Sequence, residues 1–324
     1  MYLSRFIIAA IILASFGPII RFLADYFSLV AQISLRILAA FLIALTIQVV
    51  QRTPKAVSGW RLSPKWTLIY STAFPLSVAA FTFSVTTTTI AISIFGLFAG
   101  SIATTTIISL LKSDQTEHWS SALLSIAGLL VVAVPELRES TNSIESLVGP
   151  LSALVAGILD GFANQARRRL ANAPVNELLI YQFGTGLVLA FLALLLVETG
   201  PVKAWSSWSL LIALSSGALV YGVGAIVHGG YRHVSSRIGA QILALEIPFA
   251  IALAWVFLGE RLTVPTVLGG LLVFAGAAFA TPKSPIATGS TNEKGSKAQQ
   301  PTNAAVYPDK TRQYTKPKDN QEGN

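Results

Sequence analysis

The stretch LEIPFAIALAWVFLGERLTVPTVLGGLLVFAGAAF, residues 245–279, decides the fold class of this chain. It holds two apolar runs separated by a short turn, and its charged residues are Glu246, Glu260 and Arg261. A helix of about 20 apolar residues crosses the hydrocarbon core of a bilayer. The stretch therefore predicts two consecutive membrane spans, near residues 238–259 and 264–281.

The remainder of the chain repeats this pattern. Of its 324 residues, 53% are apolar and 12% are charged, and the mean hydropathy is +0.63. These values exclude an ordinary soluble globule. Because the chain has no cysteine, disulfides, thiol nucleophiles and cysteine-based metal sites are excluded as well. The eight other predicted spans lie near residues 4–24, 28–50, 67–86, 90–111, 119–135, 147–166, 177–198 and 208–230.

Lysine and arginine are distributed unequally between the two ends of these spans. Eleven lie at one side of the predicted membrane, whereas the other side has only Arg21, Arg138, Lys203 and Arg261. Cytoplasmic loops carry the positive excess, so both termini are expected in the cytoplasm and the protein in the cell membrane. The topology accounts for the basic composition, and no nucleic-acid partner is expected.

Residues 282–324 differ from the rest in composition. They are rich in Lys, Pro, Thr, Asn, Gln and Gly, with seven basic and four acidic residues. Such a segment buries too little apolar surface to fold. It is predicted to be a disordered cytoplasmic tail, either without function or weakly attracted to the anionic leaflet.

A faint internal repeat divides the chain into two halves. A shift of 148 residues places residues 125–128 on 273–276 and residues 110–111 on 258–259. Two five-span repeats, 1–135 and 147–281, fit this shift. Because five is an odd number, the second repeat enters the membrane from the opposite side and has the inverted topology. The predicted fold is an all-α membrane protein with ten transmembrane helices as two inverted five-helix repeats, an arrangement many secondary transporters use.

Two pairs of glycines have the GxxxG spacing that lets membrane helices approach closely. Gly96 and Gly100 lie in the fourth predicted span, and Gly157 and Gly161 lie in the sixth. The spacing fits packing within one chain, and a homodimer seam is the alternative.

The 245–279 stretch closely resembles the signature of the drug/metabolite transporter superfamily, in its EamA-like branch. The resemblance rests on Glu246 and Pro248, on the turn LGERLT that contains Glu260 and Arg261, and on Gly269 and Gly276 in the last span. Arg36 in ISLRILAAFLIALTI is similar to an arginine of the family's second span. The resemblance implies ten helices, inverted halves, cytoplasmic termini and a transport function, and it does not specify the substrate.

The chain also departs from the family pattern. The family often repeats the proline and the turn glutamate in its first half, whereas here the shift places Gly100 and Lys112 at those positions. Asp160 stands where the family often has a tryptophan. Residue roles from other exporters therefore do not transfer directly.

Three charged residues lie deep within predicted spans, namely Arg36, Asp160 and Glu246. Each costs roughly 2.5–3.5 kcal/mol on insertion scales, so such residues normally face a partner or a wet cavity. Asp160 and Glu246 are expected to share a cytoplasmic vestibule, as a proton or cation site or as paired charges that lock helices. Arg36, nearer the outer side, is either an anion clamp or a brace between helices, and Pro248 either frees a carbonyl for the cavity or simply kinks its helix.

Other polar residues are weaker candidates for substrate or proton binding. Asn164 lies one helical turn after Asp160 on the same face. Glu260 and Arg261 are expected to form hydrogen bonds with the free backbone groups at the helix ends of the outer turn. The remaining candidates are Tyr181, Gln182, Tyr221, His228 and Gln241.

These features predict a secondary-active transporter that exports a small metabolite, such as an amino acid, an amine or a toxic compound. Proton coupling through the buried acids and alternating access are the expected mechanism. The expected partners are a small-molecule substrate and the lipid bilayer, with no cofactor or metal. One alternative is a flippase for a lipid-linked precursor. The other is a membrane-embedded enzyme, for which the sequence offers no HExxH, GxSxG or Gly-rich nucleotide motif.

Overall fold

The computed structural model describes residues 2–51, 58–111, 123–124, 126–131, 134, 145–196, 206–259 and 263–280. By its contacts the chain divides into two units, Met1–Pro282 and Lys283–Asn324. All described residues belong to the first unit, so the predicted tail lies outside them. Over the described residues the chain forms helices and no strand, which confirms the all-helical expectation.

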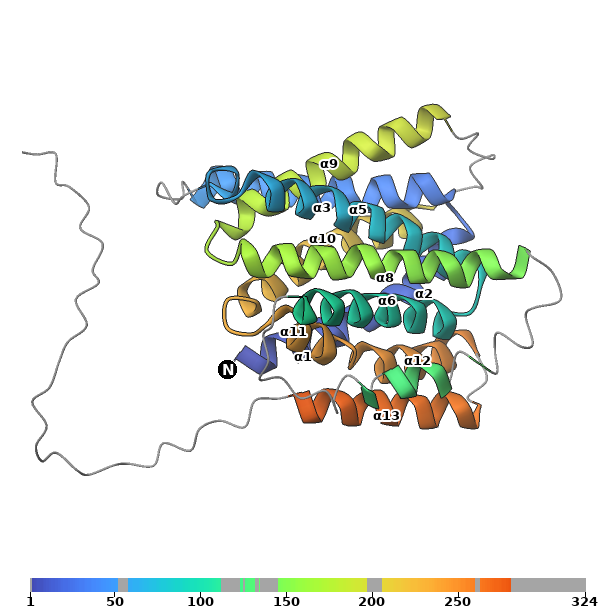
Figure 1. Cartoon of the computed structure of the whole chain (residues 1–324). Helices are drawn as coiled ribbons and strands as arrows, with labels where there is room; N and C mark the ends of the chain where they lie inside the picture. The colour runs from blue at the N-terminus through green and yellow to red at the C-terminus, as the bar shows by residue number, and fades with distance from the viewer. Residues whose placement is uncertain are drawn as a thin grey trace, which may run out of the picture. The chain divides into compact units, whose positions relative to one another are not determined.

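Twelve described helices follow one another along the chain, and the long ones run side by side (Figure 1). The first-half helices are α1 (Tyr2–Ala14), α2 (Phe16–Ala24), α3 (Leu29–Gln51), α4 (Gly59–Leu62), α5 (Pro64–Thr87) and α6 (Ile90–Leu110). The second-half helices are α8 (Glu145–Arg169), α9 (Val175–Leu196), α10 (Ser207–Gly230), α11 (Ser236–Leu243), α12 (Glu246–Leu258) and α13 (Val264–Ala280).

Eight stretches of the described chain are long and apolar enough to cross a membrane. They coincide with eight of the ten predicted spans. The predicted tenth span, 264–281, corresponds to the 17-residue helix α13. Most of the predicted fifth span, 119–135, lies outside the described residues, and its described positions, 123–124, 126–131 and 134, are helical.

Two predicted spans are divided into two helices each, because a proline interrupts the backbone hydrogen bonds. In the first span Pro18 has no N–H that could donate a hydrogen bond to the Ala14 carbonyl. The helix is therefore interrupted between α1 and α2. In the ninth span Pro248 cannot bond the Ala244 carbonyl, which instead accepts the Ile247 N–H at 3.0 Å. Glu246 thereby becomes the first residue of α12.

The burial pattern is the reverse of that in a soluble protein. Large apolar side chains face outward, with Leu196 83%, Val50 74% and Phe257 70% exposed. Polar side chains such as Gln32 and Arg36 are buried instead. Lipid would cover such an outer surface without cost, whereas water would not.

Helices of the two predicted halves pack against each other more than within each half. Helix α8 lies along both α5 and α6, α3 contacts α9 and α10, and α1 contacts α10 and α12 (Figure 1). Any site between these helices therefore receives side chains from both halves.

The two GxxxG motifs face each other across the α6–α8 seam. A Cβ added to Gly157 would lie 2.1 Å from the Leu97 carbonyl oxygen, and one added to Gly100 would lie 2.5 Å from the Leu154 carbonyl oxygen. Only glycine fits at such distances. Both motifs are therefore used for packing within the chain.

Candidate functional site

A cavity with an empty volume of about 850 Å³, part of it open to solvent, lies between the two predicted halves. Its wall is mostly apolar and aromatic, with Phe16, Phe74, Phe81 and Phe98 among its residues. Four charged side chains also line it, namely Arg36, Asp160, Arg167 and Glu246. Three of these were predicted from the sequence, and the structure places them around one space instead of dividing Arg36 from the two acids.

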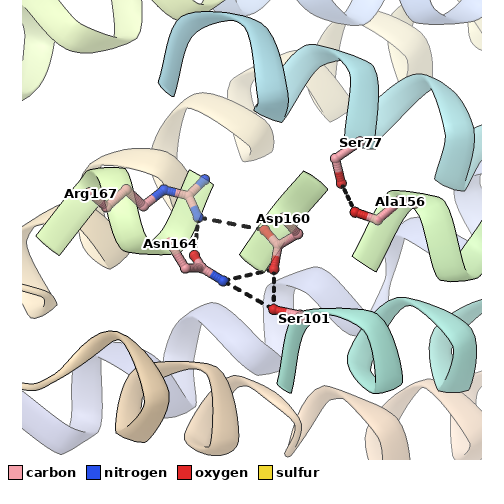
Figure 2. Close-up of polar contacts among 6 residues, drawn as sticks. All are labelled: Ser77, Ser101, Ala156, Asp160, Asn164 and Arg167. Carbon is pink, nitrogen blue, oxygen red and sulfur yellow. Dashed lines mark hydrogen bonds and ion pairs between the residues drawn. The ribbon is translucent and has the colours of Figure 1, made fainter. Parts of the chain in front are cut away.

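Asp160 on α8 is the centre of a hydrogen-bond network (Figure 2). Its Oδ2 accepts from the Ser101 hydroxyl at 2.8 Å and from the Asn164 amide at 2.7 Å. Its Oδ1 lies 3.7 Å from an Arg167 nitrogen, and the Asp160 side chain is 20% exposed. The Asn164 oxygen in turn accepts from Arg167. The carboxylate thus has a partner for each oxygen.

Arg167 does not stand out in the sequence as a site residue, because it begins the basic run Arg167–Arg169 at the end of α8, and such runs are typical of cytoplasmic loops. Its guanidinium lies 4.9 Å from the Phe74 ring centre and 5.6 Å from the Tyr70 ring centre, a geometry that favours a cation. It lies seven residues after Asp160, two turns along the same face of a helix. That spacing is the feature of the sequence that could have identified Arg167 as a neighbour of Asp160.

Close packing of α6 and α8 brings Ser101 to Asp160. Because glycines form the seam, the backbones approach closely enough for a short serine side chain to reach the carboxylate. On the other side of α8, the Ser77 hydroxyl donates to the Ala156 carbonyl at 2.8 Å (Figure 2), and Ser152 donates to the Ala80 carbonyl at 2.9 Å. Helix α8 is thus fixed to both neighbours beside the site.

Glu246 has a different environment from Asp160. Its side chain is buried, at 3% exposure, and none of the hydrogen bonds or ion pairs among the described residues involves its carboxylate. It stands at the first residue of α12, where the positive end of the helix dipole stabilises an anion. The break at Pro248 therefore creates this position.

Arg36 on α3 is 2% exposed. Its Nε donates to the Ser216 hydroxyl at 3.3 Å, and its guanidinium lies 5.6 Å from the Phe16 ring centre. One terminal nitrogen has no hydrogen-bond partner among the described residues. Arg36 also lines the cavity.

The other predicted polar candidates do not line the cavity. The Tyr181 ring lies 6.0 Å from Trp60, and the Tyr221 hydroxyl donates to Asn176 at 3.1 Å. Gln182 and Gln241 are buried with side-chain atoms that lack partners among the described residues, and His228 is buried beside the backbone of Leu170 and Ala173. Within the described part of the chain, no group of three His, Asp or Glu side chains could hold a metal ion.

The residues of the family signature fall in and beside the last two helices. The Gly269 carbonyl in α13 would lie 2.6 Å from a Cβ at Gly128, so Gly269 belongs to a close packing contact. Gly276 lies in the same helix. Glu260 and Arg261 lie outside the described residues.

Comparisons with known proteins agree with this architecture. No curated protein matches the chain, but 28 solved chains match its fold. One of them, described only as a crystal structure of a protein, has a TM-score of 0.66 and 18% sequence identity and covers 87% of this chain and 98% of its own. Residues 144–281 match the sequence profile of the EamA-like transporter family. The second half of the chain is thus similar to a family of membrane transporters, and eight stretches of the described chain are long and apolar enough to cross a membrane.

Proposed function

We propose that this protein is a secondary-active exporter of a small amphipathic metabolite and works by alternating access around the cavity. Amino acids, amines and toxic amphipathic compounds are the candidate substrates. The observation that carries the proposal is the cavity itself, which both predicted halves line and which holds Arg36, Asp160, Arg167 and Glu246 in an otherwise apolar wall. Charges are retained inside membrane proteins mainly where a substrate or ion passes.

The packing supports the proposed ten-span topology. Ser58 and Gly59, before α5, both donate to Glu177 of α9, so these loops lie at the same end of the bundle. Three described spans, α5, α6 and α8, separate them, and a return to the same end requires an even number of crossings. A further crossing between α6 and α8 is therefore proposed, where the fifth span was predicted.

The described part of that fifth segment also supports the inverted repeat. A Cβ at Gly128 would lie 2.6 Å from the Gly269 carbonyl, and Leu272 and Val273 are its next neighbours. The segment thus packs on α13, its proposed counterpart in the second half. Pairing of equivalent helices is expected where two repeats surround a pseudo-twofold axis.

The cavity chemistry suits a molecule with polar ends and an apolar body. The unpartnered Arg36 nitrogen suits an anionic group such as a carboxylate. The Glu246 carboxylate suits an ammonium group or a proton, and the phenylalanines of the wall suit an apolar portion. Asp160 is already satisfied by Ser101, Asn164 and Arg167, so Glu246 is the first candidate for coupling.

The experiment that tests this proposal is transport in proteoliposomes. Thermal shift of the purified protein against amino acids, amines and amphipathic drugs at two pH values first selects a ligand, since binding to the folded state raises stability. Flux of that ligand under an imposed pH gradient is then compared for wild type, Glu246→Gln and Asp160→Asn.

We expect Glu246→Gln and Asp160→Asn to lose gradient-driven flux. The matched control is Asp25→Asn, which removes an exposed acid at the end of α2 and should transport normally. Wild-type flux in both cavity variants would refute transport coupled through these acids.

A further inference from the structure

The groups around the Arg167 guanidinium are those that bind organic cations. On one side lie two rings of α5, with the Phe74 ring centre at 4.9 Å and the Tyr70 ring centre at 5.6 Å from the guanidinium carbon. On the other side, one Arg167 nitrogen donates to the Asn164 amide oxygen at 2.5 Å and lies 3.7 Å from the Asp160 carboxylate (Figure 2). Aromatic faces combined with a carboxylate recognise ammonium and guanidinium groups. We call Tyr70, Phe74, Asp160 and Asn164 the cation cage.

The contact between Arg167 and Asp160 is loose for a buried ion pair. Strong pairs have short, hydrogen-bonded contacts, often through two nitrogens. The 3.7 Å separation is longer than the N–H···O hydrogen bond of about 2.7–3.2 Å. The Asp160 Oδ1 can therefore accept a closer contact from another cation.

The cage keeps its shape when the guanidinium leaves. The Asp160 Oδ2 accepts from the Ser101 hydroxyl at 2.8 Å and from the Asn164 amide at 2.7 Å. Neither bond involves Arg167. These bonds hold the carboxylate in place, and the two rings belong to a different helix from Arg167.

The cage is reached from the cavity. Phe74, Asp160 and Arg167 line it, and the Asp160 side chain is 20% exposed. Arg167 lies in the last turn of α8 and is followed by the exposed Arg168 and Arg169. Its long side chain has many rotamers, so the guanidinium can move off Asp160 without a change in the helix.

Exchange of one cation for another suits the charge of the cavity. Its charged residues are two acids and two arginines, which balance. A ligand cation that bound beside Arg167 would add an unpaired positive charge to a mostly apolar wall, and such a charge is costly. A ligand cation that replaces the guanidinium at Asp160 has the same counter-charge that Arg167 had.

We propose that Arg167 is a tethered competitor for the cation cage. A cationic group of the transported molecule binds the cage in exchange for the Arg167 guanidinium, and the guanidinium returns when that molecule leaves. The inference rests on the proposed transport function and narrows its substrates to molecules with an ammonium or guanidinium group. Glu246 remains the first candidate for coupling.

Binding of the guanidinium ion to the purified full-length protein tests this exchange. Arg167→Ala empties the cage, so guanidinium chloride, well below denaturing concentrations, should raise its Tm by about 2–4 °C relative to equal sodium chloride. Wild type should show no such rise. The matched control Arg169→Ala removes an exposed arginine of the same turn and should respond as wild type does. Equal responses of Arg167→Ala and wild type would overturn the proposal.

Two further variants connect the response to the cage. Arg167→Lys keeps the positive charge, but an ammonium lacks the planar fork that lies on the rings, so guanidinium should raise its Tm to an intermediate extent. If Arg167→Ala does not fold, equal responses of Arg167→Lys and wild type overturn the proposal. Adding Asp160→Asn to Arg167→Ala should abolish the response, and a retained response would refute the assignment to Asp160.

Failure of this inference is distinguishable from failure of the proposed function. A guanidinium response in a protein that transports nothing would refute the transport function and leave the cation cage. Gradient-driven flux without any guanidinium response would refute the exchange only. Transport of a ligand that has no cationic group would also refute the exchange.

Discussion

Asp160 and Glu246 are two buried carboxylates with opposite surroundings. Asp160 has two hydrogen-bond donors and a guanidinium, so its charge is compensated by the protein itself. Glu246 has the N-terminus of α12 and no side-chain donor among the described residues. A proton or a bound cation therefore stabilises the Glu246 side chain more than it stabilises Asp160. Asp160 can bind another cation only if the Arg167 guanidinium moves away.

The Asp160–Arg167 pair makes a prediction about stability. Arg167→Met keeps a long side chain but leaves the Asp160 carboxylate without its cation. Removing one partner of a buried pair costs about 3 kcal/mol, and the partial exposure of Asp160 keeps the loss at this lower end. We expect a clearly reduced thermal stability of the purified protein.

A double-mutant cycle distinguishes lost pairing from lost packing. Adding Asp160→Asn to Arg167→Met should restore part of the stability, because the second change removes the unpaired charge. Strictly additive losses would show that the two side chains do not interact and would contradict the assigned pair.

At the scale of elements, the α6–α8 seam determines whether the site can form. Gly157 and Gly100 allow the two backbones to approach, and this approach places Ser101 against Asp160. A β-carbon in the seam would separate the helices and lengthen the bond between these side chains. Packing and site chemistry are therefore coupled at this seam.

We expect Gly157→Ala to lower the Tm and to reduce ligand binding at the same time. Its added methyl group meets the Leu97 carbonyl, and overpacking of this kind costs about 1–3 kcal/mol. Gly222→Ala in α10 is the matched control, because nothing lies within 4 Å of its added Cβ. Both changes gain the same helix propensity, so a Tm for Gly157→Ala as high as that of Gly222→Ala would argue against a tight seam.

The broken helices have a related effect on the site. An unbroken span at 238–259 would place Glu246 in mid-helix, with no free N–H groups near its carboxylate. Pro248 prevents this by ending the bond pattern at Ala244. The dipole of the short helix then favours the carboxylate, a device that transporters with discontinuous helices use for charged ligands.

At the scale of the whole molecule, the proposed topology predicts which loops face the cell exterior. Because the chain has no cysteine, single cysteines can be introduced without further changes. Asp25→Cys and Ser207→Cys, at exposed positions on one side, should react with an impermeant maleimide in intact cells. Lys65→Cys, exposed at the other end of the bundle, should react only after permeabilisation, and the reverse pattern would invert the proposed orientation.

Several features of the fold could be predicted from sequence because they depend on composition along the chain. Eight predicted spans agree with apolar helices of the structure, since the length of an apolar run follows directly from the thickness of the bilayer. Helix breaks were harder to predict. Pro18 and Pro248 could each have kinked a continuous helix, and the choice depended on local bonds to neighbouring carbonyls.

The site was predictable in part for the same reason. Arg36, Asp160 and Glu246 stand out as charges in apolar runs, whatever the fold. Arg167 does not stand out, because it begins a basic run at a helix end and resembles a topology signal. Its position over the Phe74 ring and beside Asp160 depends on how α5 and α8 pack.

The sequence by itself determined that this is a helical membrane protein, because the cost of placing charge and open backbone in lipid acts on each segment separately. Tertiary structure decided which charges meet. It placed Arg36 and the two acids around one cavity. It also gave the Asp160 carboxylate hydrogen-bond donors and a cation, and it left Glu246 without a side-chain donor among the described residues. Those outcomes depend on helix contacts between residues far apart in the chain, such as Ser101 with Asp160 and Arg36 with Ser216, and no local pattern specifies them.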